Sequence, residues 1–294
     1  MAGGTRMTDY NQSQHGNFML GLGAQKAGTS WIHKQLKRHP NTDFGCLKEY
    51  HVHDARTIPK LARFREININ IAKPLTWIQP RTFLRQLFIQ SPERYTDYFE
   101  WLLRRPRWRN RQIHLTGDIT PSYALLDSKT LKEIRNSFEK RGIIVKPVFI
   151  MRDPIERLIS SQRMKLRKQG SRDLATEINT LRRRVKKGRG IRSDYQQTVN
   201  ALEESFGLNN CFIGLFENLF TKSTYQRLCD YLDLTYQEPA WSEVVNKSAT
   251  DNTIPDDLLE EIGQLEKSNL DTAKELFPAL DFSDLWPTAT RWCK

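Results

Sequence analysis

Short apolar runs alternate along the chain with longer segments in which apolar residues recur at helical spacing. The runs predict buried strands over residues 17–22, 113–116, 143–151 and 211–216. The longer segments predict helices over residues 29–38, 128–140, 154–168, 174–187, 193–206, 221–232 and 256–267, and residues 60–111 are predicted to be mostly helical. Strands that alternate with helices predict an α/β fold, in which helices flank a central, mostly parallel sheet.

The composition is that of a globular protein with excess positive charge. The 294 residues include 46 basic and 34 acidic side chains, a formal net charge of +12, which favours anionic partners. Residues 1–16 are polar and predict a disordered tail before a single domain over 17–294. We find no apolar core of a signal peptide, and no apolar run reaches the length of about 18 residues that predicts a transmembrane segment. The four cysteines form no CxxC pair and fit a reducing compartment, so we expect a soluble, cytoplasmic protein.

A glycine-rich loop follows the first predicted strand directly. Gly23 and Gly28 have the spacing of a phosphate-binding loop, in which backbone N–H groups meet an anion at a helix N-terminus. The nucleotide triphosphatase version places a lysine directly after the second glycine, whereas here Thr29 follows Gly28 and Lys26 lies inside the loop. This arrangement disfavours an ATPase or GTPase and suits a donor whose leaving group is a phosphate with no obligatory metal. Trp31 is placed either to stack on an adenine ring or to pack in the core.

A second candidate anion site follows the third predicted strand. Residues 148–151 lead directly into Arg152, Asp153 and Pro154, and a helix begins there. Arg152 therefore lies at the carboxyl end of a strand, where open α/β sheets bind ligands. Ser160 follows two turns into the helix and is placed to bond the same anion. The alternative interpretation of this segment is a salt-bridged turn.

Together, these two segments resemble the sulfotransferases that use 3′-phosphoadenosine 5′-phosphosulfate. The run Lys26-Ala27-Gly28-Thr29-Ser30-Trp31 resembles their 5′-phosphosulfate loop, and residues 149–160 resemble their 3′-phosphate motif. The resemblance implies a P-loop-like nucleotide-binding fold, adenosine 3′,5′-bisphosphate as the second product, and no required metal. It implies that residues 26–30 hold the 5′-phosphosulfate, that Arg152 and Ser160 hold the 3′-phosphate, and that Trp31 lines the adenine pocket. Lys247 matches a late loop over the nucleotide.

A third segment is similar to the glycan-type members of that family. Residues 48–54, Lys-Glu-Tyr-His-Val-His-Asp, resemble their Lys-Glu-x-x-Phe-Phe segment, in which the glutamate is the proposed general base. This resemblance makes Glu49 the first candidate for the base, with His51 and His53 as rivals, because neutral histidine accepts a proton near neutral pH. Residues 117–123 resemble the Glu-Lys-x-Pro-x-Tyr segment, but Asp118 replaces the glutamate and Ile119 replaces the lysine.

The expected reaction is in-line transfer of a sulfuryl group to a hydroxyl or amine, with Lys26 stabilising charge on the bridging oxygen. Residues 60–111 are expected to shape the acceptor pocket, and an acidic compound or a glycan would fit. Two basic runs, 104–111 and 182–192, are interpreted either as solvated surface or as a positive rim for such an acceptor. They leave a nucleic-acid-binding protein as one alternative, and the glycine loop leaves a nucleotide kinase or ATPase as another. No helix-turn-helix or zinc motif supports nucleic acid.

Overall fold

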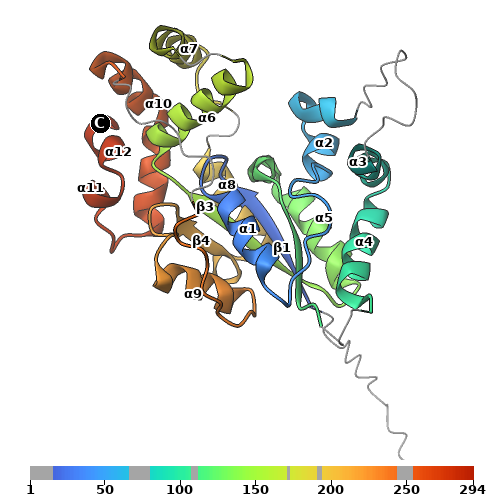
Figure 1. The fold of residues 1–294 in the computed structure, drawn as a ribbon. Helices are drawn as coiled ribbons and strands as arrows, with labels where there is room; N and C mark the ends of the chain where they lie inside the picture. Colours follow the sequence, from blue (N-terminus) through green and yellow to red (C-terminus); the bar gives the residue numbers. More distant parts are fainter. Residues whose placement is uncertain (1–15, 66–79, 107–111, 171–172, 191–193, 244–253) are drawn as a thin grey trace, which may run out of the picture.

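A computed structural model describes residues 16–65, 80–106, 112–170, 173–190, 194–243 and 254–294. Four strands form one parallel sheet in the order β2-β1-β3-β4. They are β1 (Asn17–Gly23), β2 (Leu115–Ile119), β3 (Ile144–Met151) and β4 (Phe212–Leu215). The predicted α/β fold is confirmed. In Figure 1, α1 (Thr29–Arg38) crosses in front of the sheet, while α5 (Ser128–Glu139) and α8 (Tyr195–Phe206) lie behind it.

The other helices form two groups on either side of the sheet (Figure 1). On one side are α6 (Pro154–Lys168), α7 (Leu174–Lys186), α10 (Asp256–Leu276), α11 (Phe282–Leu285) and α12 (Pro287–Trp292). On the other are α2 (His53–Thr57), the 3-10 helix η1 (Pro59–Arg65), α3 (Pro80–Gln90) and α4 (Pro92–Arg104). The remaining elements are η4 (Pro121–Leu125), η5 (Leu208–Asn210) and α9 (Lys222–Tyr231). No helix in the described ranges is both long and apolar enough to cross a membrane.

Three predicted boundaries are wrong. The second strand begins later and ends later than 113–116, because Asp118, beyond the predicted end, is fully buried in β2 on hydroxyl partners. The helix predicted to end at 267 continues to Leu276, and α11 and α12 follow it. The start of α8 is capped by Asp194, whose side chain accepts from the Gln197 N–H. Ser193, the predicted cap, lies outside the described residues.

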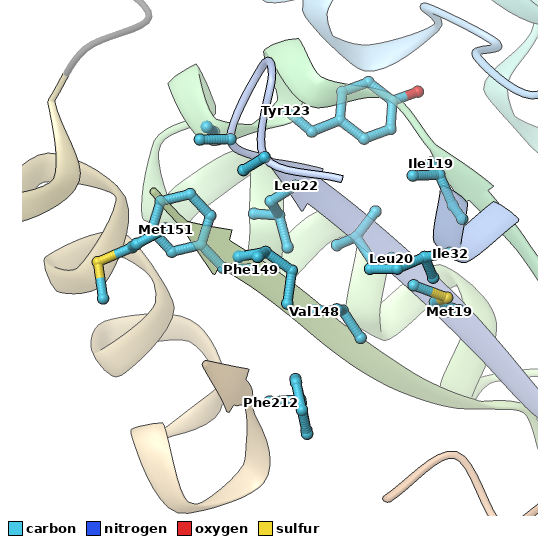
Figure 2. Packing of buried hydrophobic residues seen from close by; sticks show 14 of the residues in the cluster. Met19, Leu20, Leu22, Ile32, Ile119, Tyr123, Val148, Phe149, Met151 and Phe212 are labelled. Carbon is cyan, nitrogen blue, oxygen red and sulfur yellow. The ribbon is translucent and has the colours of Figure 1, made fainter. Parts of the chain in front are cut away.

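The core surrounds β1, all of whose residues are buried. At one end of the strand, Phe18 stacks on Phe138 and meets Phe99 edge to face, with centroid separations of 4.0 Å and 4.8 Å. Figure 2 shows Leu20 and Leu22 of β1 beside side chains from β3, with Phe212 of β4 below them. Full burial of one side chain of this size contributes about 1.5–3 kcal/mol to the stability of the fold. The buried side chains of β1 therefore hold the sheet together, and with it the positions of the segments that follow the strands.

Candidate nucleotide and transfer site

The glycine loop joins β1 to α1 and presents the N-terminus of α1. Gly28 is the N-cap residue with φ of 76°, and no side chain caps this end of the helix. A Cβ at Gly28 would lie 2.6 Å from Leu219, so both its backbone conformation and its surroundings require glycine. Lys26 also has a positive φ of 73°. The Ala24 N–H donates to the Ile150 carbonyl at 2.7 Å, which fixes the loop to β3. The free N–H groups of the first turn of α1 can therefore receive an anion.

Arg152 lies against this loop, although it is 126 residues away in sequence. Its Nη1 donates to the Lys26 carbonyl at 3.0 Å, and its guanidinium lies 4.6 Å from the centroid of the Phe216 ring. Partial burial lowers the pKa of Lys26, and the nearby Arg167 and Arg152 lower it further. The two predicted anion-binding segments thus meet, and their crowded positive charges favour an anionic ligand.

Three more residues that were predicted to contact the donor lie in α6 and at the start of α1. Ser160 is buried in α6, the helix that starts beside Arg152. Its neighbour Arg157 is also buried and points to Glu266 of α10, with 3.8 Å between Nη2 and Oε1. Thr29 is buried at the start of α1 and Ser30 is half-buried beside it. Lys247 lies outside the described residues.

Trp31 is 2% exposed and belongs to an aromatic cluster. Its ring lies 5.1 Å from Phe220, 5.5 Å from Tyr225 and 5.9 Å from Trp241, the last in a stacked geometry. Its indole Nε1 is buried and has no hydrogen-bond partner among the described residues. The structure therefore places Trp31 in the core packing of α1, and the contact with adenine stays a prediction.

The segment 48–54 reaches the N-terminus of α1 from the other side. The Lys48 ammonium donates to Thr29 Oγ1 at 3.4 Å and to Glu49 Oε1 at 2.8 Å. Glu49 Oε2 lies 3.4 Å from His51 Nε2. Arg85 of α3 donates to the Glu49 carbonyl at 3.0 Å, which fixes the backbone of the segment. The candidate base is therefore linked through one lysine to the loop that the sequence assigns to the donor.

His51 is held between two carboxylates. Its Nδ1 lies 2.7 Å from Oδ2 of Asp54, which is fully buried and also accepts from the Ser122 hydroxyl. Its ring stacks on Phe64 with a centroid separation of 4.0 Å. Burial alone would lower the pKa of His51, but the hydrogen bonds with Asp54 and Glu49 raise it. The imidazole is consequently stabilised as a cation with a fixed orientation.

The contact with His51 shifts the pKa of Glu49 in the opposite direction. Burial would raise the pKa of its carboxyl, but the hydrogen bond with His51 and the Lys48 ammonium lower it to about 2. Glu49 is thus ionised at neutral pH. His53, the other rival, packs edge to face against Tyr95 and Tyr123, and burial lowers its pKa to about 4. That histidine lies among aromatic side chains and not beside the loop.

Asp118 connects this segment to the sheet. Its carboxylate accepts from the hydroxyls of Tyr95 at 3.0 Å, Tyr123 at 2.7 Å and Thr120 at 2.6 Å, and from the Tyr50 N–H at 3.3 Å. Neither these contacts nor the role of Asp54 was predicted. The spacing of His51 and Asp54 by one turn was the local signal for their pairing, whereas the partners of Asp118 come from segments far apart in sequence.

Several arginines of the two basic runs make contacts within the chain. Arg182 bonds Asp257 at 2.6 Å, and Arg189 donates to the Leu265 carbonyl at 3.0 Å, so both join the α7 region to α10. Arg104 pairs with Glu100 at 3.0 Å, and Arg105 pairs with Asp43 at 2.5 Å. Arg105, Arg182 and Arg189 thus join different parts of the fold, whereas the Arg104 pair lies within α4. Residues 107–111 and 191–192 of the runs lie outside the described ranges.

Comparison with known proteins identifies the architecture. No protein-family model matches the chain, and no curated protein does. The chain is similar in structure to a sulfotransferase from Alicyclobacillus acidocaldarius, with a TM-score of 0.55, 18% identity, and coverage of 92% of this chain and 98% of that one. The sulfotransferase domain of the Synechococcus PCC 7002 olefin synthase matches with a TM-score of 0.49, 14% identity, and coverage of 87% and 94%. On the first of these matches, the chain has the sulfotransferase fold.

Proposed function

We propose that this protein transfers a sulfuryl group from 3′-phosphoadenosine 5′-phosphosulfate to a hydroxyl or amine acceptor. The observation that carries the proposal is the 3.0 Å contact between Arg152 and the Lys26 carbonyl on a sulfotransferase fold. It brings two cationic segments together at one edge of the sheet, and a donor with a phosphate group at each end of its ribose needs two such segments. The proposed base, Glu49, lies beside the same loop through Lys48.

In this proposal, residues 26–30 and the open N-terminus of α1 bind the 5′-phosphosulfate. Arg152 and Ser160 bind the 3′-phosphate, Trp31 lies at the adenine side, and Lys247 belongs to the loop over the nucleotide. The donor contacts all come from backbone amides, hydroxyls and cations, which suits a polyanion.

The proposed transfer is an in-line displacement at sulfur. The acceptor oxygen or nitrogen forms a bond to sulfur, the bond from sulfur to the bridging phosphate oxygen breaks, and Glu49 takes the acceptor proton. The products are the sulfated acceptor and adenosine 3′,5′-bisphosphate. Lys26 stabilises the negative charge that grows on the bridging oxygen. Glu49 suits the role of base because it is ionised, whereas its hydrogen bond with His51 raises the pKa of the imidazole and so favours the form that has no free lone pair.

Both alternative functions receive less support. A nucleotide triphosphatase needs a carboxylate that is free to bind magnesium near the loop, but Asp118 at the end of β2 is saturated by three hydroxyls and one N–H. A nucleic-acid-binding protein was expected to use the two basic runs, and four of their arginines, Arg104, Arg105, Arg182 and Arg189, already bond groups within the chain.

The first prediction concerns donor binding. Lys26→Ala and Arg152→Ala should each weaken the binding of adenosine 3′,5′-bisphosphate by about 10- to 100-fold, because a hydrogen bond to a charged group contributes about 1.5–3 kcal/mol. Isothermal titration calorimetry measures this affinity without an acceptor. The matched controls are Lys187→Ala and Arg183→Ala, which remove exposed cations of α7 and the residue after it. Unchanged affinity in both site variants, or magnesium-dependent ATP turnover by the wild type, would refute the proposed function.

The second prediction concerns the acceptor, which we propose is anionic. The neighbouring elements α2, η1 and α3 carry five exposed cations that form no ion pair with any described acidic residue: Arg56, Lys60, Arg63, Arg65 and Arg81. Arg63 lies 5.2 Å from the centroid of Phe64, the ring that stacks on His51. A hydroxyl acceptor with a nearby carboxylate should thus be preferred over its neutral ester, and the preference should fall in high salt.

The test compares the two acceptors at about 50 mM salt, where charges are weakly screened, and at about 500 mM salt, where they are strongly screened. Arg63→Ala should reduce the preference by up to about fivefold, as expected for one exposed ion pair, and should leave transfer to the neutral ester unchanged. Lys186→Ala, at the far end of α7, is the control. A preference for the neutral acceptor would contradict an anionic acceptor without affecting the donor assignment.

A further inference from the structure

The C-terminal helix α12 packs against the start of α6, next to Arg152, and α11 packs against α12. Trp286 connects the two helices and is fully buried. Its indole Nε1 donates to Oε2 of Glu217 at 2.7 Å. The end of α12 also packs closely on α10 at Gly263, where a Cβ would lie 2.1 Å from the Trp292 carbonyl oxygen. The C-terminal segment therefore reaches the region of the sheet edge that binds the nucleotide in the proposed function.

Glu217 in turn holds the backbone beside Arg152. Its Oε1 accepts from the Asp153 N–H at 3.2 Å, and this N–H belongs to the peptide that joins Arg152 to Asp153. The other side of Asp153 is held as well, since its Oδ2 accepts from the Ala289 N–H of α12 at 2.9 Å. The C-terminal segment thus acts on the residue that follows Arg152 in two ways, directly through Ala289 and indirectly through the Trp286–Glu217 bond.

The Arg152 side chain is restrained by three groups. Its Nη1 bonds the Lys26 carbonyl, its Nη2 lies 3.9 Å from Oε2 of Glu156, and its guanidinium lies over Phe216. Its backbone is bonded by the Tyr195 hydroxyl, which donates to the Arg152 carbonyl at 2.7 Å. The position from which the guanidinium reaches these groups is set by the backbone, where Tyr195 acts on one side of the peptide and Glu217 on the other.

We propose that Glu217 and Trp286 are positioning residues for Arg152, so that the C-terminal segment sets how tightly the protein holds the 3′-phosphate of its nucleotide. The proposal rests on the proposed function, in which Arg152 binds that phosphate. Removing the Trp286–Glu217 bond lets the Glu217 carboxylate move away from the Asp153 N–H, so the peptide that carries Arg152 loses its fixed position. Binding of the 5′-phosphate through the glycine loop does not depend on this contact.

The experiment compares two nucleotides that differ only in the 3′-phosphate. Trp286→Phe keeps an aromatic ring and removes the indole N–H. Calorimetry should show adenosine 3′,5′-bisphosphate bound about 3- to 10-fold more weakly, the range expected for one lost hydrogen bond, with adenosine 5′-monophosphate bound as by the wild type. Glu217→Gln, which retains one of the two acceptor oxygens, should shift the same ratio in the same direction. The matched control is Trp292→Phe, because Trp292 of α12 donates no indole hydrogen bond to a described residue.

Each outcome decides between a positioning role and a structural one. If both nucleotides weaken by one factor, or if neither changes in folded Trp286→Phe and Glu217→Gln, the positioning role is wrong. If Trp286→Phe does not fold, the nucleotide ratio in Glu217→Gln alone decides. A wild type that binds the two nucleotides equally would instead overturn the assignment of Arg152 to a 3′-phosphate, and with it the proposed function.

Discussion

Replacing Glu49 by glutamine is expected to slow sulfuryl transfer by about two to four powers of ten and to leave donor binding near the wild-type value. The expected factor is that of a general base. Glutamine has nearly the same shape and can still accept from Lys48, which lies 2.8 Å away, so the loop should keep its position. Single-turnover transfer with labelled donor measures the rate, and calorimetry with adenosine 3′,5′-bisphosphate measures the binding.

The variant His51→Gln separates the two candidate bases. Since the His51–Glu49 contact lowers the pKa of Glu49, loss of the imidazole should raise that pKa toward its ordinary value and slow transfer less than Glu49→Gln does. The pKa of His51 is raised in the folded protein, so its ion pairs stabilise the fold at low pH and are lost as pH rises through that pKa. Full transfer in Glu49→Gln together with no transfer in His51→Gln would assign the base to the histidine instead.

Local signals in the sequence predict the strand and the helix on either side of the glycine loop well. A strand, a glycine loop and a helix in immediate succession depend only on neighbouring residues, and β1 and α1 lie where the pattern predicts. The contact between Lys26 and Arg152 depends on β1 and β3 being neighbours in the sheet, which parallel alternation makes probable but does not fix. The resemblance of the two motifs to parts of one nucleotide site already implied, from the sequence, that the two segments lie close together.

The parts that were not predicted depend on contacts between distant segments. Ser122 reaches Asp54 across 68 positions, and Trp286 reaches Glu217 across 69. A buried aspartate in β2 reads as a turn in the sequence because its charge is normally exposed. Only the folded chain shows that Tyr95 and Tyr123 satisfy it. Side-chain hydrogen bonds of this kind leave no periodic pattern, so the supports of the site stay invisible until the elements are assembled.

The carboxyl ends of β1, β2 and β3 explain why the candidate site forms where it does. The glycine loop follows β1, Arg152 follows β3, and Thr120 follows β2, which is bonded to β1 on the side opposite β3. Parallel strands bring their carboxyl ends to one edge, and side chains placed there converge. Asp118 holds the Tyr50 N–H at this edge, so the segment that carries Glu49 and His51 is fixed to the same sheet as the donor loop.

Asp118 is therefore expected to be a main determinant of stability. Asp118→Ala would leave three buried hydroxyls and one N–H without their acceptor, and we expect it to lower the free energy of unfolding by about 3–5 kcal/mol. Asp118→Asn keeps one acceptor oxygen and should cost less. Urea denaturation followed by circular dichroism measures both changes. The exposed Asp284→Asn is the control and should have little effect.

The pH dependence separates the charge of Asp118 from its hydrogen bonds. Burial raises the pKa of its carboxyl from 3.8 to about 6, although the hydroxyl partners act to lower it. Between these two values the folded state binds more protons than the unfolded state, so the free energy of unfolding from this group falls as pH rises from about 4 to about 6. Asp118→Asn has no such proton, and its deficit relative to wild type should be largest near pH 4 and smaller near pH 7. An equal deficit at both values would mean that the pKa of Asp118 is the same in the folded and unfolded states, so that the hydroxyls fully offset the effect of its burial.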